Sequence, residues 1–164
     1  MKSGFQLVQL TLLPAVDVSG LCRKPYPLHP KGCPNWNKKL GCPPTCRRVD
    51  HVLDLSQPIY AIYNAFDFAT HTAKMRAKHP DWSQRQVECC LYWQGTARKT
   101  LRSLFIEFRK AHPGLHVMMT PEGSGVDITA TMASIGINLE WPPVNVAYQV
   151  AIAGTAREYP DVTS

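Results

Sequence analysis

The chain has 164 residues, of which 45% are hydrophobic and 18% are charged, with a formal net charge of +6. This length allows one domain with a real core, and the composition is ordinary for a soluble globular protein. No stretch approaches the ~18–20 consecutive apolar residues of a membrane span. Gln6, Gln9 and Thr11 interrupt the first apolar run, which argues against a signal peptide. We therefore expect a cytoplasmic protein with no membrane contact.

Residues 5–13 predict a first strand, because apolar and polar residues alternate there before the run becomes apolar. Residues 22–48 follow as a long loop, since six prolines between positions 25 and 44 fix φ and remove backbone donors. A loop of this length inside a compact domain requires something that holds it in place. Its four cysteines, closing around a metal centre, are the best candidates.

A second strand is expected at 58–63, and Asp67 is placed to cap a helix over 68–78. The dipeptide His79-Pro80 should end that helix. Overlapping capping boxes, Asp81 with Gln84 and Ser83 with Gln86, then predict a long helix to about residue 111.

The predicted buried face of this long helix follows the 3.6-residue period, and Gly95 is the point where the helix could kink or split. Its members are Val87, Cys90, Leu91, Leu101, Leu104, Phe105 and Phe108. The basic residues Arg98, Lys99, Arg102 and Arg109 fall largely on the opposite face.

Beyond this helix, residues 115–119 predict a short buried strand, 126–136 a short helix, 137–141 another strand and 144–154 a final one. Residues 155–164 form a tail that we expect to be frayed. This order predicts an α/β or α+β fold for the whole chain, as a single domain over residues 1–164. Its centre should be a mixed sheet of four or five strands with two or three helices, preceded by the long cysteine-rich loop.

The cysteines of the loop have the spacing Cys22-x10-Cys33-x8-Cys42-x3-Cys46. Structural zinc usually takes two tight cysteine pairs, and only the last two approach such a pair. An iron–sulfur cluster tolerates more scattered ligands, because it is larger than one ion. The Cys-Pro steps at 33–34 and 42–43 resemble those of ferredoxin-type runs. Gly32 and Gly41 would let the backbone approach the sulfides closely.

We therefore favour an iron–sulfur cluster, [4Fe–4S] above other types, with Cys22, Cys33, Cys42 and Cys46 as the candidate ligands. Zinc, with His29 as a substitute ligand, is the alternative, and disulfides or free thiols are the third possibility. Three cysteine ligands would leave one iron open for catalysis, whereas four would make a structural or electron-transfer centre.

The positive charge of the chain is concentrated in the same loop, which contains no acidic residue. Without the seven basic residues of the loop, the rest of the chain has eleven basic and twelve acidic residues. Such a patch suits nucleic acid, a phosphate-bearing small molecule or an anionic metal–thiolate cluster. The seven residues are Arg23, Lys24, Lys31, Lys38, Lys39, Arg47 and Arg48.

Two further stretches are candidates for chemistry. Residues 121–125, PEGSG, lie between a predicted strand and a predicted helix, where free amides can bind an anion. Gly123, Ser124 and Gly125 would then bind the anion, and Glu122 would act as an acid, base or ligand. A tight connection without a function is the alternative. In the pair Cys89-Cys90, we expect a buried structural thiol at Cys90 and a reactive or remotely ligating thiol at Cys89.

The segments GCPNWNKKLGCPP and PEGSGVDITATMASIGINLEW resemble the DUF2284 family of predicted metal-binding proteins. That family combines an N-terminal cysteine cluster ending in Cys-Pro-Pro with a later segment of the form Glu, small residue, Gly-Val/Ile-Asp-Ile/Val. The matching positions are 41–44 and 122–137, and the wide spacing of the first cysteines and the position of Cys46 depart from the pattern. The resemblance implies metal or iron–sulfur binding and supplies no reaction.

Two functions follow from these features. The first is an iron–sulfur enzyme of sulfur or redox chemistry on a phosphate-bearing or nucleic-acid substrate, with Glu122 and Cys89 as its candidate catalytic residues. The second is a non-catalytic module, stapled by zinc or a cluster, that binds nucleic acid or a protein. The sequence does not decide between an enzyme and such a module.

Overall fold

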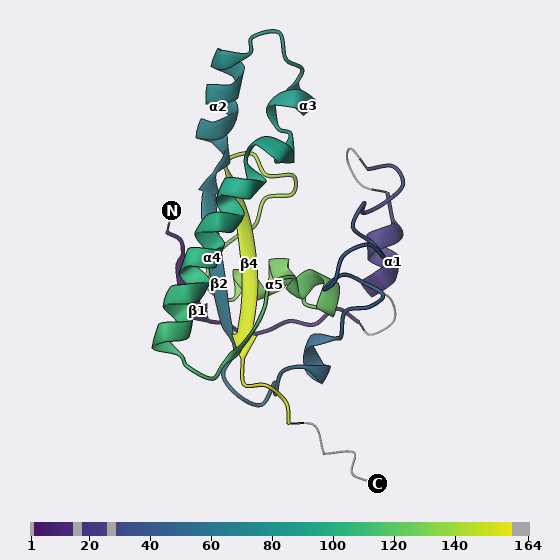
Figure 1. Cartoon of the computed structure of the whole chain (residues 1–164), viewed down its shortest axis with the longest axis vertical. Helices are drawn as coiled ribbons and strands as arrows, with labels where there is room; N and C mark the ends of the chain where they lie inside the picture. Colours follow the sequence, from purple (N-terminus) through teal and green to yellow (C-terminus); the bar gives the residue numbers. More distant parts are fainter. Residues whose placement is uncertain (1, 15–17, 26–28, 159–164) are drawn as a thin grey trace.

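Four strands form one antiparallel sheet in the computed structural model, which describes residues 2–14, 18–25 and 29–158. The spatial order is β1-β2-β4-β3, and Figure 1 shows β2 between β1 and β4. The α+β class, the single domain and a four-stranded sheet are therefore confirmed. The expected mixed sheet is wrong, because every pairing between the described strands is antiparallel. The strands are β1 (Gly4–Leu7), β2 (Tyr60–Asp67), β3 (His116–Met118) and β4 (Val146–Gly154).

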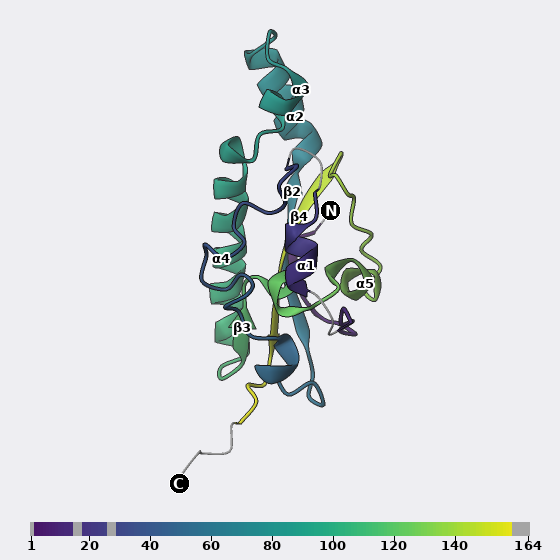
Figure 2. The ribbon, with the colours of Figure 1, turned by 90° about the vertical axis from the view of Figure 1, so that its right-hand side faces the viewer.

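Helices cover both faces of this sheet. Figure 2 shows α4 and α5 on opposite sides of β2 and β4, and Figure 1 shows α1 apart from the sheet, on the side of β4. The helices are α1 (Val18–Arg23), α2 (Phe68–Lys78), α3 (Gln84–Val87), α4 (Gln94–Ala111) and α5 (Ile128–Ala133). Three short 3-10 turns are η1 (Val49–His51), η2 (Cys90–Tyr92) and η3 (Pro121–Ser124).

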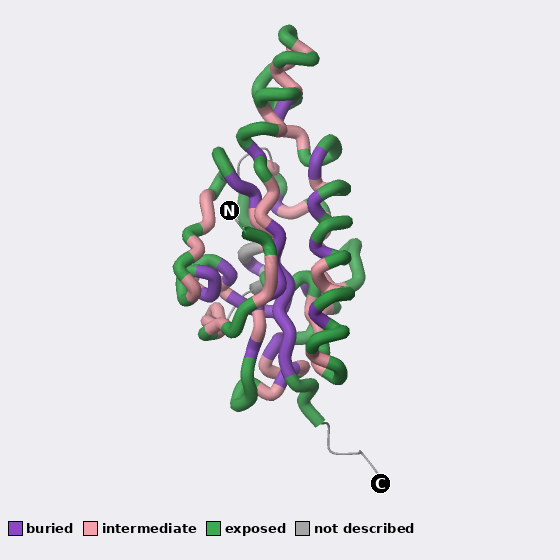
Figure 3. Tube along the Cα trace, turned by 90° about the vertical axis from the view of Figure 1, so that its left-hand side faces the viewer, coloured by how far each residue is buried: buried purple, intermediate pink, exposed green. Residues whose placement is uncertain are grey.

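The core has one layer on each face of the sheet. On one face, Leu101 and Phe108 of α4 pack against Ile62 of β2. On the other, Met132 of α5 packs against Ile152 of β4. Figure 3 shows that the buried positions run along the two central strands. The sheet is thus a rigid platform between the two helix layers.

The predicted helix over 68–78 is confirmed as α2. The Asp67 carboxylate accepts a hydrogen bond from the backbone N–H of Thr70 at 2.9 Å, and the helix ends at Lys78, before His79. The capping box of Ser83 and Gln86 is also present, at the start of α3. Local capping chemistry was therefore sufficient to position these helix ends.

The predicted long helix is interrupted between Val87 and Gln94, so it is not continuous, and Gly95 lies inside the first turn of α4. Burial of Trp93 explains the break. Its ring packs against Phe66 and Phe68, and its Nε1 donates to the carbonyl of Glu88 at 3.2 Å. A continuous helix would not allow this arrangement.

Two members of the predicted buried face are exposed as a result of this break. Leu91 is 84% exposed, and Cys90 is exposed as well. The expectation that Cys90 is a buried structural thiol is therefore wrong.

Three other strand predictions differ from the structure. The first strand ends at Leu7, and Leu12 makes only an isolated bridge to Val126. The strand at 115–119 is confirmed as the short β3, but it is a half-exposed edge rather than a buried strand. Residues 137–141 form no strand, and there the Glu140 carboxylate accepts hydrogen bonds from the backbone N–H groups that follow it.

The tail is ordered as far as Arg157, which corrects the expectation that fraying begins at residue 155. Asp54 N–H donates to the Thr155 carbonyl at 2.9 Å, and Arg157 N–H donates to the Val52 carbonyl at 2.8 Å. Residues 159–164 of the predicted tail lie outside the described residues. In the described part of the chain, no helix has the length and apolar character needed to cross a membrane.

Candidate metal centre

Cys22 and Cys33 are brought together at the end of α1. The helix stops at Arg23, before the first proline of the loop, and Cys33 N–H donates to the Cys22 carbonyl at 2.7 Å. Gly32 has φ of 82°, and a Cβ added to it would lie 2.6 Å from the Cys22 carbonyl oxygen. Only glycine fits this contact, because both the backbone conformation and the space exclude a side chain.

Cys42 and Cys46 are brought together by one turn of the chain. Cys46 N–H donates to the Cys42 carbonyl at 3.1 Å, and Asn37 N–H donates to the Pro43 carbonyl at 2.9 Å. The second bond folds the loop back on itself. Further turn bonds, from Lys38 and Lys39 N–H to the Asn35 carbonyl and from Cys42 N–H to the Lys39 carbonyl, complete the local fold.

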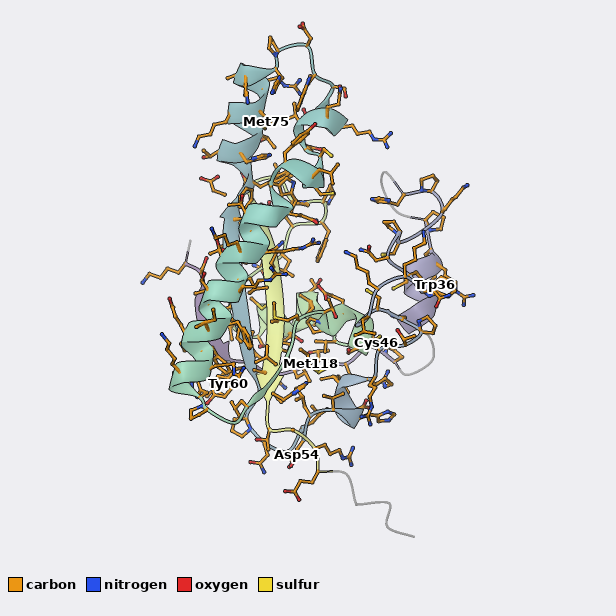
Figure 4. All side chains as sticks on the ribbon, in the orientation of Figure 1. Trp36, Cys46, Asp54, Tyr60, Met75 and Met118 are labelled. Carbon is orange, nitrogen blue, oxygen red and sulfur yellow. The ribbon has the colours of Figure 1, made fainter. Side chains whose placement is uncertain are left out.

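The cysteine loop packs against η3, so the two stretches that the sequence analysis treated separately are neighbours. The Thr120 hydroxyl donates to the Gly41 carbonyl at 2.8 Å, and the Cys46 thiol donates to the Gly123 carbonyl at 2.9 Å. A Cβ on Gly123 would lie 3.2 Å from both Gly41 O and Pro43 Cδ. In Figure 4, Cys46 lies on the side of the loop that faces the sheet, whereas Trp36 lies farther out.

The four thiols of the loop share one electrostatic neighbourhood. Burial raises the pKa of the Cys22 thiol, and the thiols of Cys33, Cys42 and Cys46 raise it further. Burial and Cys33 also raise the pKa of Cys42, against the opposing effect of Lys39. Burial followed by Cys42 raises the pKa of Cys46. The other three candidate ligands therefore lie within electrostatic range of Cys22, and the three raised pKa values favour protonated thiols in the metal-free chain.

This donor set fits a thiolate-bound centre in its chemistry. All four cysteines are free and half-buried, and residues 22–48 contain no acidic side chain. Among the described residues, no group of three or more His, Cys, Asp or Glu side chains is placed to hold a metal ion. The cysteines are therefore of the right type and lie in the same region for a metal centre, but the described residues do not form a complete ligand sphere. A ligand thiolate carries no proton, so metal binding by Cys46 would replace its hydrogen bond to Gly123.

Three of the amides that follow Glu122, those of residues 125–127, donate within the protein. Gly125 N–H donates to the Glu122 carbonyl, Val126 N–H to Pro121, and Asp127 N–H to Thr11. The Asp127 carboxylate caps α5. The absence of a side chain at Gly123 allows the cysteine loop to pack closely against η3. The anion-binding role of Gly123, Ser124 and Gly125 stays a prediction from the sequence.

The two candidate catalytic residues lie in different parts of the molecule. Glu122 lies in η3, open to a cleft, yet desolvation by the surrounding protein raises the pKa of its carboxyl. Its carboxylate in turn contributes to the raised pKa of the Cys22 thiol and of the Cys42 thiol. Cys89 is half-buried between α3 and η2, where Glu88 rather than Cys89 lines the cleft. The structure thus brings Glu122, but not Cys89, to the cysteine loop.

Among the basic residues of the loop, two lysines are exposed and two arginines contact other side chains. Lys38 and Lys39 are exposed, whereas the Arg48 guanidinium forms an ion pair with Asp50 at 3.1 Å. The Arg23 guanidinium lies 5.7 Å from the centre of the Trp36 ring. The lysines are therefore the residues most available to an external anion.

A cleft of about 920 Å³ separates the loop from the sheet and α4. Cys42 and Glu122 line it from one side, and Arg98 and Arg102 from another. The helical period alone predicts both arginines on the face opposite the buried side of a helix and indicates no function for them. Their spacing of four residues, which puts them on one side of α4, was the available signal. That a cleft lies beside them depends on the packing of the loop.

Comparisons with family models, with curated proteins and with solved structures give no match for this chain. The resemblance to the DUF2284 family therefore depends on the two quoted segments alone. Structurally, those segments are the cysteine loop and the region from η3 through α5, which contact each other.

Proposed function

We propose that residues 22–48 form the binding loop of an iron–sulfur cluster, [4Fe–4S] in preference to other types, with Cys22, Cys33, Cys42 and Cys46 as its ligands. The observation that carries this proposal is that backbone hydrogen bonds join Cys33 to Cys22 and Cys46 to Cys42 on a loop without acidic residues. Thiolates repel one another, and a positively charged centre removes that repulsion. The proline content supports the same view, because such a loop gains order from a bound centre.

The loop would contribute more than ligands. Burial and Cys33 raise the pKa of the Cys42 thiol, and Lys39 opposes this rise and so favours the thiolate that a ligand must become. Glu122, open to the cleft beside Cys42, can hold a proton near a bound substrate. When bound, a cluster with one open iron would supply sulfur or redox chemistry, and a fully ligated one would carry electrons or stabilise the fold.

A polyanionic partner is part of the same proposal. The whole positive excess of the chain lies in the loop, and Lys38 and Lys39 are exposed there. This arrangement supports a phosphate-bearing small molecule or nucleic acid as the partner. A non-catalytic module, stapled by zinc or a cluster, that binds nucleic acid or a protein is the alternative. In a zinc site His29 would be a substitute for one of the four cysteines.

Anaerobic purification of the full chain tests the metal centre. We expect a brown protein with broad absorption near ~400 nm and equal amounts of iron and acid-labile sulfide. Cys33→Ala or Cys42→Ala should lose metal and stability, because metal-binding energy is partly folding energy. Cys90→Ala is the matched control, since that thiol is exposed and lies outside the loop.

Two results would contradict the proposal. A colourless protein with one zinc per chain would establish the zinc alternative. If the Cys42→Ala chain has the same metal content and stability as the Cys90→Ala control, the loop is not the metal-binding site.

A further inference from the structure

One edge of β4 is unpaired where it faces the cleft. β3 pairs only with the C-terminal part of β4, and its last residue, Met118, lies opposite Ile152. The chain then leaves the sheet, because the Thr120 side chain bonds to Gly41 in the cysteine loop. The cleft wall accordingly includes five consecutive β4 residues, 146–150.

The direction of the backbone groups on this edge follows from the register. Val8 N–H donates to the Ile59 carbonyl at 3.0 Å, which makes these two residues a hydrogen-bonded pair. Such pairs alternate along antiparallel strands, so Asn64 of β2 points its backbone groups toward β4. Asn64 pairs with Gln149. Gln149 therefore points toward β2, and its neighbours Tyr148 and Val150 point away, into the cleft.

The edge is open over a short, defined length. At one end, Val146 N–H donates to the Glu140 carboxylate at 3.3 Å. At the other end, β3 pairs with Ile152. Between them, the backbone N–H and C=O groups of Tyr148 and Val150 have no partner in any described strand or loop. A row of alternating donors and acceptors is complementary to another extended chain.

The two walls beside this edge differ in chemistry. An added strand would place alternate side chains on the α4 side of the sheet and the others on the α5 side. Arg98 and Arg102 line the α4 side, and Leu139 and Trp141 follow α5 on the other. The cleft also contains Glu88, whose carboxylate accepts from Gln84, and Glu122 next to the cysteine loop. The Glu140 carboxylate is committed to the backbone of 144–146.

We propose that the cleft binds an extended peptide, with alternating acidic and apolar side chains, as an added strand on the edge of β4 at residues 148–150. Its main chain bonds to Tyr148 and Val150, its acidic side chains meet Arg98 and Arg102, and its apolar ones meet Leu139 and Trp141. The residues proposed to contact the peptide, on β4, α4 and the segment after α5, lie outside the cysteine loop, whose residues form the opposite wall of the cleft. A second copy of this chain fits less well, because its own β4 edge is recessed in the same way.

The test uses the full-length chain and a fluorescein-labelled heptapeptide of alternating glutamate and valine, blocked at both ends. We expect saturable binding by fluorescence anisotropy. Amide hydrogen exchange should show that Tyr148 and Val150 exchange fast in the free chain and become protected with the peptide. Gln149 and Ala151, which bond to β2, should be protected in both states.

Three controls separate strand addition from simple charge attraction. A peptide N-methylated at alternate residues keeps its charge but loses its donors, so it should bind at least about tenfold more weakly. Arg98→Glu with Arg102→Glu should weaken binding by about tenfold or more. Lys99→Glu with Lys110→Glu, two exposed residues of α4 outside the cleft, should leave binding nearly unchanged.

Several results would overturn the proposal. The first is that the N-methylated peptide binds as tightly as the unmodified one. The second is that the peptide protects only amides other than those of Tyr148 and Val150. The third is that binding does not saturate up to about 1 mM peptide. A dimer in light scattering, with Tyr148 and Val150 already protected without peptide, would show that a second copy occupies the edge. Loss of metal in the Cys42→Ala chain with intact peptide binding would leave this inference standing and separate it from the proposed metal centre.

Discussion

At the scale of single residues, the glycine at position 32 controls whether Cys22 and Cys33 can lie together. It combines a left-handed conformation with so little space that an added Cβ would lie 2.6 Å from the Cys22 carbonyl oxygen at the end of α1. Gly114 has a similar φ of 92°, but a Cβ added there meets nothing within 4 Å. Substitution of Gly114 therefore measures the free-energy cost of a side chain at positive φ alone, whereas substitution of Gly32 adds the cost of a steric clash.

Gly32→Ala should therefore open the start of the loop, whereas Gly114→Ala should cost only about 1 kcal/mol of conformational strain. Metal content and amide exchange of Cys33, whose N–H bonds to Cys22, measure the effect. We expect faster exchange and less bound metal in Gly32→Ala alone. Identical exchange and metal content in the two variants would show that the contact is unimportant.

At the scale of elements, Asn64 joins β2 to its neighbours on both sides. It is 3% exposed, its Nδ2 donates to the Ala97 carbonyl of α4 at 3.0 Å, and its Oδ1 accepts from the Ser3 hydroxyl. Asn64→Ala would leave the buried Ala97 carbonyl without this donor. We expect a loss of roughly 2 kcal/mol in the free energy of unfolding, measured in urea.

The exposed Asn138 supplies the control for this substitution. Asn138→Ala should change the free energy of unfolding by no more than about 0.5 kcal/mol. If both alanine variants unfold at the same urea concentration, Asn64 does not anchor α4.

At the scale of the whole molecule, the asymmetry of charge leads to a prediction about polyanions. Lys38→Glu with Lys39→Glu should weaken binding of a 20-nucleotide single strand and flatten its dependence on salt. The slope of log K against log salt should fall by about 1.4, since each phosphate contact contributes about 0.7 for single strands. Lys74→Glu with Lys78→Glu makes the same charge change on α2. A similar change of slope in both pairs would mean that net charge alone, and not the loop, attracts the nucleic acid.

Much of the helix and strand pattern was predictable because it depends on neighbours in the sequence. The Asp67 cap, the Ser83 capping box and the apolar β4 required only local chemistry. The long-helix prediction was wrong because burial of Trp93 against Phe66 and Phe68 outweighed a continuous helical period. Tertiary packing of one large ring decided that boundary.

The sequence by itself determined that four cysteines, six prolines and all of the positive excess occupy one acid-free loop, and that an α+β domain follows. Only the tertiary structure decided that this loop packs on η3 beside Glu122, across a cleft from Arg98 and Arg102. It alone also decided that the edge of β4 stays unpaired there. The physical reason is that composition and capping act between near neighbours, whereas a cleft and an open strand edge arise from contacts between segments that are distant in the chain.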